Sequence, residues 1–124
     1  MIDADVAIDH LRGRAEAIAY LDSSLDELLM CAITVAELYA GYKGADEKAK
    51  LDGFVGMLEV VPVTATDAVR GGEYRNRYGK SHGTDLNDAI VAAASESQRA
   101  KVVTLNRKHY PMLGDSLVVP YVKK

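Results

Sequence analysis

The sequence predicts an α/β fold in which a mostly parallel sheet of about five strands carries helices on both faces. Short apolar runs alternate along the 124 residues with longer segments whose apolar residues recur at helical spacing. No internal repeat and no linker of biased composition interrupts this alternation. Because parallel strands are joined by helical crossovers, the pattern is typical of one α/β domain, which we expect to cover residues 1–124.

The first half of the chain contains two predicted strands and four predicted helices. In order, we expect a strand, two helices, a strand and two helices, at residues 1–2, 6–11, 15–29, 30–33, 34–41 and 46–58. Asp5 can cap the first helix, because its side-chain oxygen can accept a hydrogen bond from a backbone N–H. Thr34 and Glu37 have the spacing of a capping box, in which two side chains bond the backbone reciprocally.

The second half contains three predicted strands and two predicted helices. The strands are expected at 59–63, 101–105 and 117–119, and the helices at 66–78 and 84–95, with a loop at 79–83. Thr66 and Asp67 can cap the first helix, although Gly71 and Gly72 weaken it. Thr84 or Asp85 can cap the second helix, whose apolar face is formed by Leu86, Ala89, Ile90 and Ala93.

Composition indicates a folded cytoplasmic protein. Apolar residues make up 48% of the chain, and no apolar run is long enough to cross a membrane. Acids at Asp3 and Asp5 argue against a signal peptide. The single cysteine, Cys31, cannot form an internal disulfide and is expected to be a small buried residue.

Charge is unevenly distributed along the sequence. The net charge is −3, yet residues 1–62 hold 12 acids and 5 bases, whereas residues 63–124 hold 6 acids and 10 bases. The basic residues of the second half include Arg70, Arg75, Arg77, Lys80, Arg99, Arg107 and Lys108. Such a surface would suit a phosphate-rich ligand held beside a metal, although an ordinary solvated surface gives the same pattern.

Acidic and amide side chains follow strands or begin helices at one predicted edge of the sheet, namely Asp3, Glu37, Asp88 and Asn106. Converging carboxylates repel one another, and a divalent cation removes that cost. Oxygen-only ligands favour Mg²⁺ or Mn²⁺ over zinc, and the three histidines are scattered. The alternative is that these acids only cap helices and interact favourably with helix dipoles.

Four ordered blocks of the sequence resemble PIN domains, and among them the VapC toxins of toxin–antitoxin pairs. The blocks are residues 2–9 (IDADVAID), 33–41 (ITVAELYAG), 87–94 (NDAIVAAA) and 103–110 (VTLNRKHY). The resemblance covers nearly the whole chain. It implies a PIN-like parallel-sheet fold and a Mg²⁺- or Mn²⁺-dependent endoribonuclease, together with an antitoxin that folds over the toxin and blocks it. Homodimers are usual in the family.

The resemblance also assigns roles by position. It makes Asp3, Glu37 and Asp88 the three catalytic, metal-binding acids, and it gives Thr104 a supporting hydroxyl that hydrogen-bonds within the cluster. The fourth acidic position falls at Asn106, whose amide oxygen can ligate a cation without adding charge. Asp85, one turn before Asp88, is a further candidate for completing the metal site.

Other functions are compatible with parts of this pattern. A catalytically inert PIN-like interaction module would retain the fold with acids that only cap helices, and a metal-dependent DNase would share the acidic cluster. A receiver-type phosphoacceptor domain is disfavoured, because residues 59–66 place no aspartate at a strand tip. Aromatic and apolar residues within 34–58 further suggest a groove for an antitoxin segment, with a separate face for a symmetric dimer.

Overall fold

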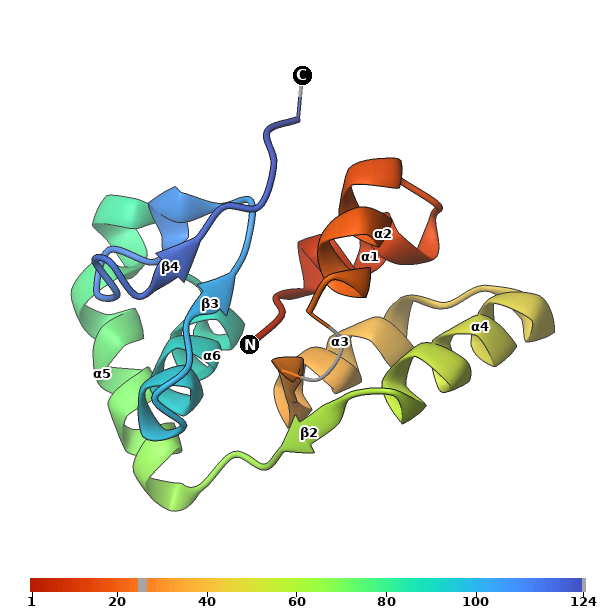
Figure 1. The fold of residues 1–124 in the computed structure, drawn as a ribbon. Helices are drawn as coiled ribbons and strands as arrows, with labels where there is room; N and C mark the ends of the chain where they lie inside the picture. Colours follow the sequence, from red (N-terminus) through yellow and green to blue (C-terminus); the bar gives the residue numbers. More distant parts are fainter. Residues whose placement is uncertain (25–26, 124) are drawn as a thin grey trace.

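Short strands and helices alternate along the chain, in the order that the sequence predicts. The computed structural model describes residues 1–24 and 27–123 (Figure 1). Its helices are α1 (Ala4–Leu11), α2 (Ala15–Asp22), α3 (Ala32–Gly41), α4 (Gly44–Gly56), α5 (Ala65–His82) and α6 (Leu86–Ser97). The strands are β1 (Leu29–Cys31), β2 (Glu59–Val61), β3 (Val102–Val103) and β4 (Leu117–Val118), with a 3-10 turn, η2, at Arg107–His109.

The strands form two parallel pairs. β1 pairs with β2, and β3 pairs with β4. The N-terminal segment runs between the pairs, because Ile2 N–H donates to the carbonyl of Leu29 at 2.8 Å and Val103 N–H donates to that of Met1 at 2.8 Å. Only an isolated parallel bridge joins Ile2 to Val103, so the expected sheet of about five strands is not confirmed.

Side chains of consecutive strand residues enter opposite core clusters. Met1, Cys31 and Val102 pack with residues of α6, whereas Ile2, Met30 and Val103 pack with residues of α1, α2, α3 and α4. This alternation is the two-residue period of extended chain. Figure 1 accordingly shows α5 and α6 on one side of the strands and α1–α4 on the other. Helices therefore cover both faces, as the sequence predicts.

Several predicted boundaries in the first half are wrong. Asp3, not Asp5, caps α1 and accepts from Ala4 N–H. α2 ends at Asp22, because Ser23 donates its hydroxyl to the carbonyl of Tyr20 and closes the helix; part of the predicted span 15–29 lies outside the described residues. The predicted strand 30–33 is shorter and ends at Cys31, because α3 begins at the next residue.

The predicted capping box at Thr34 and Glu37 is also wrong. The N-cap of α3 is Cys31, which makes no side-chain cap bond, so Thr34 is already the third residue of the helix. Because Thr34 has helical backbone, its hydroxyl cannot take the place of an N-cap oxygen. Thr34 is instead fully buried.

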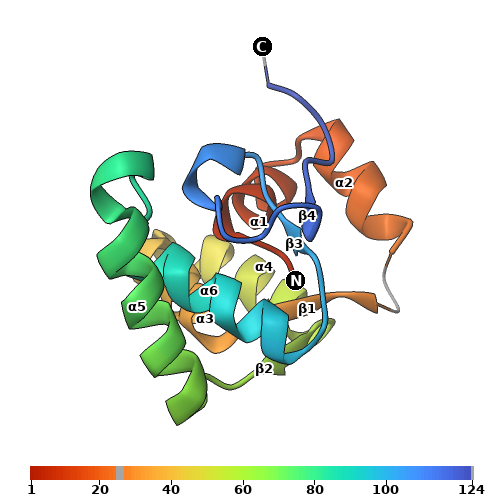
Figure 2. The ribbon, with the colours of Figure 1, turned by 90° about the vertical axis from the view of Figure 1, so that its left-hand side faces the viewer.

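Helix α5 begins earlier and ends later than predicted. Its N-cap is Thr64, not Thr66, and the side chains of Thr64 and Asp67 form a capping box. The helix continues through the predicted loop 79–83 to His82 and stops at Gly83, whose φ of 66° is left-handed. Figure 2 shows α5 and α6 side by side, so packing against α6 stabilises α5 despite its paired glycines.

Helix α6 begins as the sequence predicts, with Asp85 as its N-cap. Of the predicted apolar face, Ala89 and Ala93 are buried, whereas Leu86 is 51% exposed because it lies in the first turn, at the surface. The buried cysteine is confirmed at position 31. Within residues 1–24 and 27–123, no helix is both long and apolar enough to span a bilayer.

Candidate functional site

Asp3 lies where the N-terminal segment turns into α1. Its backbone N–H donates to the carbonyl of Val103 at 2.9 Å, which fixes it beside β3. One carboxylate oxygen accepts from Ala4 N–H at 2.8 Å, and the other accepts from the hydroxyls of Thr104 at 2.8 Å and Tyr110 at 2.7 Å. Asp3 is buried, so these donors replace the water that a carboxylate otherwise requires.

Asp88 lies in the first turn of α6, where it forms a capping box with Asp85. Asp88 N–H donates to Asp85 Oδ1 at 2.8 Å, and Asp85 N–H approaches Asp88 Oδ2 at 3.4 Å. The hydroxyl of Tyr110 lies 3.2 Å from Asp88 Oδ1, and Nδ1 of His109 lies 3.2 Å from its Oδ2. Burial, followed by the charges of Asp85 and Asp3, raises the pKa of Asp88 to about 7.

Glu37 of α3 is close enough to Asp3 and Asp85 for their charges to affect its pKa. Partial burial and the charge of Asp3 raise the pKa of Glu37, and Asp85 adds to this effect. A hydrogen bond with Asn87, the neighbour of Asp88 in α6, acts in the opposite direction. The charge of Asp3 therefore affects the acids of two separate helices, Glu37 of α3 and Asp88 of α6.

Asp5 is a member of this cluster that the sequence analysis interpreted only as a helix cap. Its Oδ2 accepts from Leu105 N–H at 2.9 Å, from the Thr104 hydroxyl at 3.2 Å and from the Asn106 side-chain amide at 3.3 Å. Burial and the charge of Asp3 raise the pKa of Asp5. Asp5 thus fixes the turn after β3, and the Asn106 amide nitrogen is used as a donor to a carboxylate.

Tyr110 is the second residue that the sequence analysis missed. Its ring is 2% exposed, and its hydroxyl contacts both Asp3 and Asp88. Burial and these two carboxylates raise the pKa of Tyr110 well above its usual range, so the hydroxyl remains a donor. The residue type was the signal in the sequence that could have indicated this role, because a buried tyrosine usually has a hydrogen-bond partner for its hydroxyl.

The donor set fits a hard divalent cation. It offers carboxylate and amide oxygens without thiolates. Burial first, and then neighbouring carboxylates, raise the pKa values of Asp5, Glu37 and Asp88, and a bound cation would offset both effects. No group of three His, Cys, Asp or Glu side chains within the described residues is drawn together tightly enough to be assigned as a metal centre. Cation binding would therefore need these side chains to converge further.

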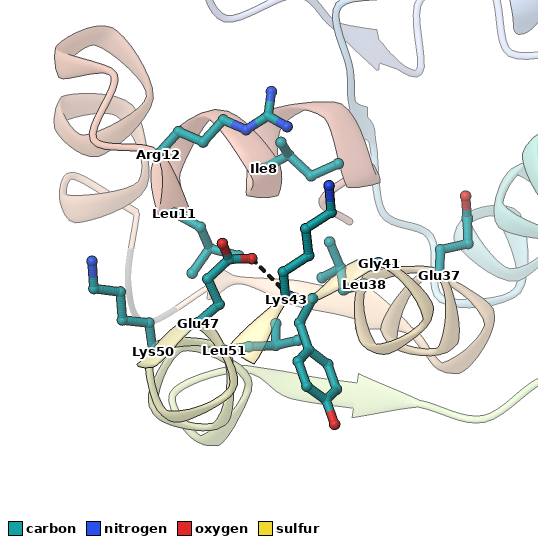
Figure 3. A pocket seen from close by; sticks show the side chains of 11 residues that line it. Ile8, Leu11, Arg12, Glu37, Leu38, Gly41, Lys43, Glu47, Lys50 and Leu51 are labelled. Atoms are coloured by element: carbon teal, nitrogen blue, oxygen red, sulfur yellow. Dashed lines mark hydrogen bonds between the residues drawn. The ribbon is translucent and has the colours of Figure 1, made fainter. Parts of the chain in front are cut away.

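A groove of about 500 Å³ has Glu37 among its lining residues (Figure 3). It is formed by the last turn of α1, the end of α3 and the start of α4, with Leu38 and Leu51 among its lining residues. Charged side chains also line it, at Arg12, Glu37, Lys43, Glu47 and Lys50. Glu37 lines the groove and is also affected by the charges of Asp3 and Asp85, so it connects the groove to the cluster.

Sequence comparison identifies the family. The family model described as PIN domain matches residues 1–112. The chain belongs to the PIN-domain family. Two similar relatives from Mycobacterium tuberculosis (strain H37Rv) narrow this assignment to the VapC group. Ribonuclease VapC19 is 35% identical over 125 aligned positions, covering 98% of each chain. Ribonuclease VapC10 is 34% identical over 115, covering 90% of this chain and 86% of the relative.

Solved structures confirm the PIN-like fold. A toxin–antitoxin complex from Klebsiella pneumoniae contains a chain with a TM-score of 0.84 and 23% identity, and the match covers 98% of both chains. DNA-bound VapBC from Salmonella typhimurium gives a TM-score of 0.75 at 22% identity, with 95% of both chains covered. At this identity the likeness establishes the fold alone.

In this PIN domain the predicted site residues differ in how directly they contact one another. Asp3, Asp88 and Thr104 are joined by hydrogen bonds, with Tyr110 between the two aspartates. Asp85 is connected to them through its capping box with Asp88. Glu37 is connected to the cluster only through the charges of Asp3 and Asp85, which raise its pKa, and the side-chain amide of Asn106 donates to Asp5.

Proposed function

We propose that this PIN domain, residues 1–124, is the toxin of a cytoplasmic toxin–antitoxin pair and acts as an endoribonuclease that hydrolyses RNA phosphodiester bonds. The observation that carries the proposal is the convergence of Asp3 and Asp88 on one buried hydroxyl. Two carboxylates from distant parts of the chain lie close together, and the pKa of Asp88 is raised to about 7. Clustered carboxylates with strongly shifted pKa values occur preferentially at functional sites.

The cofactor that suits these ligands is Mg²⁺ or Mn²⁺, held by Asp3, Asp88 and Glu37, with Asp85 and Asn106 as further candidate ligands. When bound, such an ion lowers the pKa of a coordinated water and stabilises charge on a phosphodiester under attack. Thr104 orients Asp3 by donating to its Oδ2. Asp5 keeps Thr104 and Asn106 in place through the turn that follows β3.

Two features support RNA as the substrate. Both M. tuberculosis relatives are named ribonucleases. Exposed basic side chains lie on α5, which leads into Asp85, and on η2, which precedes Tyr110. They are Arg75, Arg77, Lys80, Arg107 and Lys108. Lysine and arginine contacts to phosphates release counterions, so RNA binding should weaken steeply with rising salt concentration.

The groove is the proposed site for an antitoxin segment. The Klebsiella and Salmonella structures are both toxin–antitoxin assemblies. In this chain the groove combines an apolar floor at Leu38 and Leu51 with a charged rim, which suits an amphipathic peptide. Because Glu37 lines its end, an arginine or lysine of the antitoxin would reach the acids. We further propose a homodimer that forms through a separate face.

Cleavage assays with the purified chain test the nuclease function. Single-stranded RNA should be cut in the presence of Mg²⁺ or Mn²⁺, and a chelator should stop the reaction. Asp3→Asn and Asp88→Asn should abolish cleavage while circular dichroism shows an unchanged fold. Asp115→Asn, which alters an exposed aspartate in the loop before β4, is the matched control and should remain active.

The same assay separates the competing functions. A metal-dependent DNase would cut single-stranded DNA in preference to RNA. An inert interaction module would show no metal-dependent cleavage of either. Cleavage that persists in both Asp3→Asn and Asp88→Asn would remove the acidic cluster from the mechanism.

A further inference from the structure

The hydroxyl of Tyr110 lies between two carboxylates that come from distant parts of the sequence, Asp3 and Asp88. It is 2.7 Å from Asp3 Oδ2 and 3.2 Å from Asp88 Oδ1. The ring is held in the core cluster that includes Val91 of α6 and Val102 of β3. The backbone beside it is also fixed, because the hydroxyl of Thr84 donates to the carbonyl of His109 at 2.7 Å.

The two carboxylates differ in how much they depend on Tyr110. Asp3 is also held by Ala4 N–H and by the Thr104 hydroxyl, both at 2.8 Å. The other contacts of Asp88, from Asp85 N–H at 3.4 Å and from His109 at 3.2 Å, are both to its Oδ2. Among the described residues, Tyr110 is the hydrogen-bond partner of Asp88 Oδ1 and joins Asp88 to Asp3.

Electrostatics alone would drive these carboxylates apart. Within the described residues no lysine or arginine forms a salt bridge with either aspartate, and the contact of Asp88 with His109 Nδ1, at 3.2 Å, is made by its other oxygen, Oδ2. A phenylalanine would fill the same space in the core without any bond to them. The tyrosine hydroxyl is thus the group that offsets the repulsion between the carboxylates of Asp3 and Asp88.

We propose that Tyr110 is a positioning residue, whose hydroxyl holds the carboxylates of Asp3 and Asp88 together so that both can ligate one divalent cation. This inference rests on the proposed metal-dependent function and deepens it. A site whose ligands are held near one another before the cation arrives binds it more tightly, because less free energy is spent on their final convergence. Tyr110 acts through the two aspartates and needs no contact with substrate.

The test is Mn²⁺ binding to the RNA-free protein, measured by isothermal titration calorimetry on the wild type and Tyr110→Phe. The matched control is Tyr74→Phe, because Tyr74 packs against the same core cluster and donates its hydroxyl to the carboxylate of Glu96 at 2.5 Å, at the other end of α6. Tyr110→Phe should weaken Mn²⁺ binding about tenfold, whereas Tyr74→Phe should leave it within about twofold.

A double-mutant cycle separates positioning from general destabilisation. If Tyr110 acts through Asp3, Tyr110→Phe should have little further effect on Mn²⁺ binding in an Asp3→Asn background. If Tyr110→Phe folds poorly alone, Gly72→Ala is added to both it and the wild type, because alanine at this exposed site stabilises α5 away from the cluster. The comparison is then made between those two proteins.

The outcomes distinguish this inference from the proposed function. A wild type that does not bind Mn²⁺, or Asp3→Asn and Asp88→Asn variants that bind it as well as the wild type, would overturn the metal-dependent function itself. If the wild type binds Mn²⁺ and those variants bind it more weakly, while Tyr110→Phe binds it as tightly as or more tightly than the wild type, only the positioning role of Tyr110 is wrong.

Discussion

The backbone of Gly71 in α5 lies directly against Ile90 in α6. A Cβ atom at position 71 would come within 2.9 Å of Ile90 Cγ1 and 3.1 Å of Ile90 Cα, which is closer than carbon atoms normally approach. Position 72 has no such neighbour, and a Cβ atom there would meet open space. One glycine therefore sets how closely α5 packs on α6, the helix that presents Asp88, while its neighbour has no packing role.

This difference predicts opposite effects for two alanine substitutions in consecutive positions. Gly71→Ala should lower the free energy of unfolding by about 1–3 kcal/mol, because α5 and α6 must separate. Gly72→Ala should raise it by about 0.5–1 kcal/mol, because alanine favours helix over glycine at an exposed position. Urea denaturation measures both. A Gly71→Ala variant as stable as Gly72→Ala would show that the helices are not packed this closely.

The buried hydroxyl of Thr34 gives a second prediction. Thr34 is fully buried, and its Oγ1 has no hydrogen-bond partner among the described residues. Thr34→Val replaces that hydroxyl by a methyl group and should raise the free energy of unfolding by about 1 kcal/mol. If Thr34 instead capped α3, the same change should cost about 1 kcal/mol. Thermal unfolding of the two proteins decides between these accounts.

Much of the fold was predictable because the signals were local. The start of α6 at Asp85 and the burial of its alanines follow from a cap and a helical period. The boundaries of α3 and α5 were not predictable in the same way. Thr34 and Glu37 have capping spacing, but α3 already begins at Ala32, with Cys31 as its N-cap. Gly71 weakens a helix in isolation, yet here it permits the contact with Ile90.

The site was predictable to the extent that the family resemblance indicated it. Asp3, Glu37, Asp88 and Thr104 were expected from their positions, and the structure brings Asp3, Asp88 and Thr104 into one hydrogen-bonded group. Tyr110 was not expected, because its contacts join residues separated by 107 and 22 positions, which no local pattern reveals.

The raised pKa of Asp88 predicts how stability depends on pH. A carboxyl whose pKa is raised from 3.8 to about 7 on folding binds its proton more tightly in the folded state. Its contribution to stability is therefore complete below pH about 4 and is lost as pH rises through about 7. In the presence of chelator, Asp88→Asn should flatten this decline in melting temperature. A pH profile identical to that of the wild type would contradict the raised pKa.

The charged contacts of Asp9 predict the opposite pH dependence. Burial alone would raise the pKa of Asp9, but hydrogen bonds from Lys123 and Tyr121 lower it overall. Its contribution to stability is thus present above pH about 4 and is lost as pH falls through the lowered pKa. Lys123→Met should lower the melting temperature at pH 7 by about 3–6 °C.

Lys48→Met is the control for this effect. The side chains of Lys48 and Lys123 are both 49% exposed, but Lys48 pairs with Asp52, which is 48% exposed, whereas Asp9 is 7% exposed. An exposed pair is screened by water, so Lys48→Met should change stability little. Equal losses in the two variants would show that burial of Asp9 does not strengthen its contact with Lys123.

The groove between α1, α3 and α4 gives a final prediction, which is that Tyr42 contributes to antitoxin binding. Tyr42 lines this groove, is 40% exposed and packs edge-on against Tyr39. Exposed aromatic residues beside apolar pockets often supply a large share of binding free energy, so Tyr42→Ala should weaken antitoxin binding at least about tenfold.

Val69→Ala, on α5 and outside the groove, is the control, since Val69 is 64% exposed and should not affect binding. Each variant would be co-expressed with a candidate antitoxin, and the affinity of the complex would be measured by surface plasmon resonance. Unchanged affinity in Tyr42→Ala, or a complex whose contacts avoid residues 34–58, would place the antitoxin on another face.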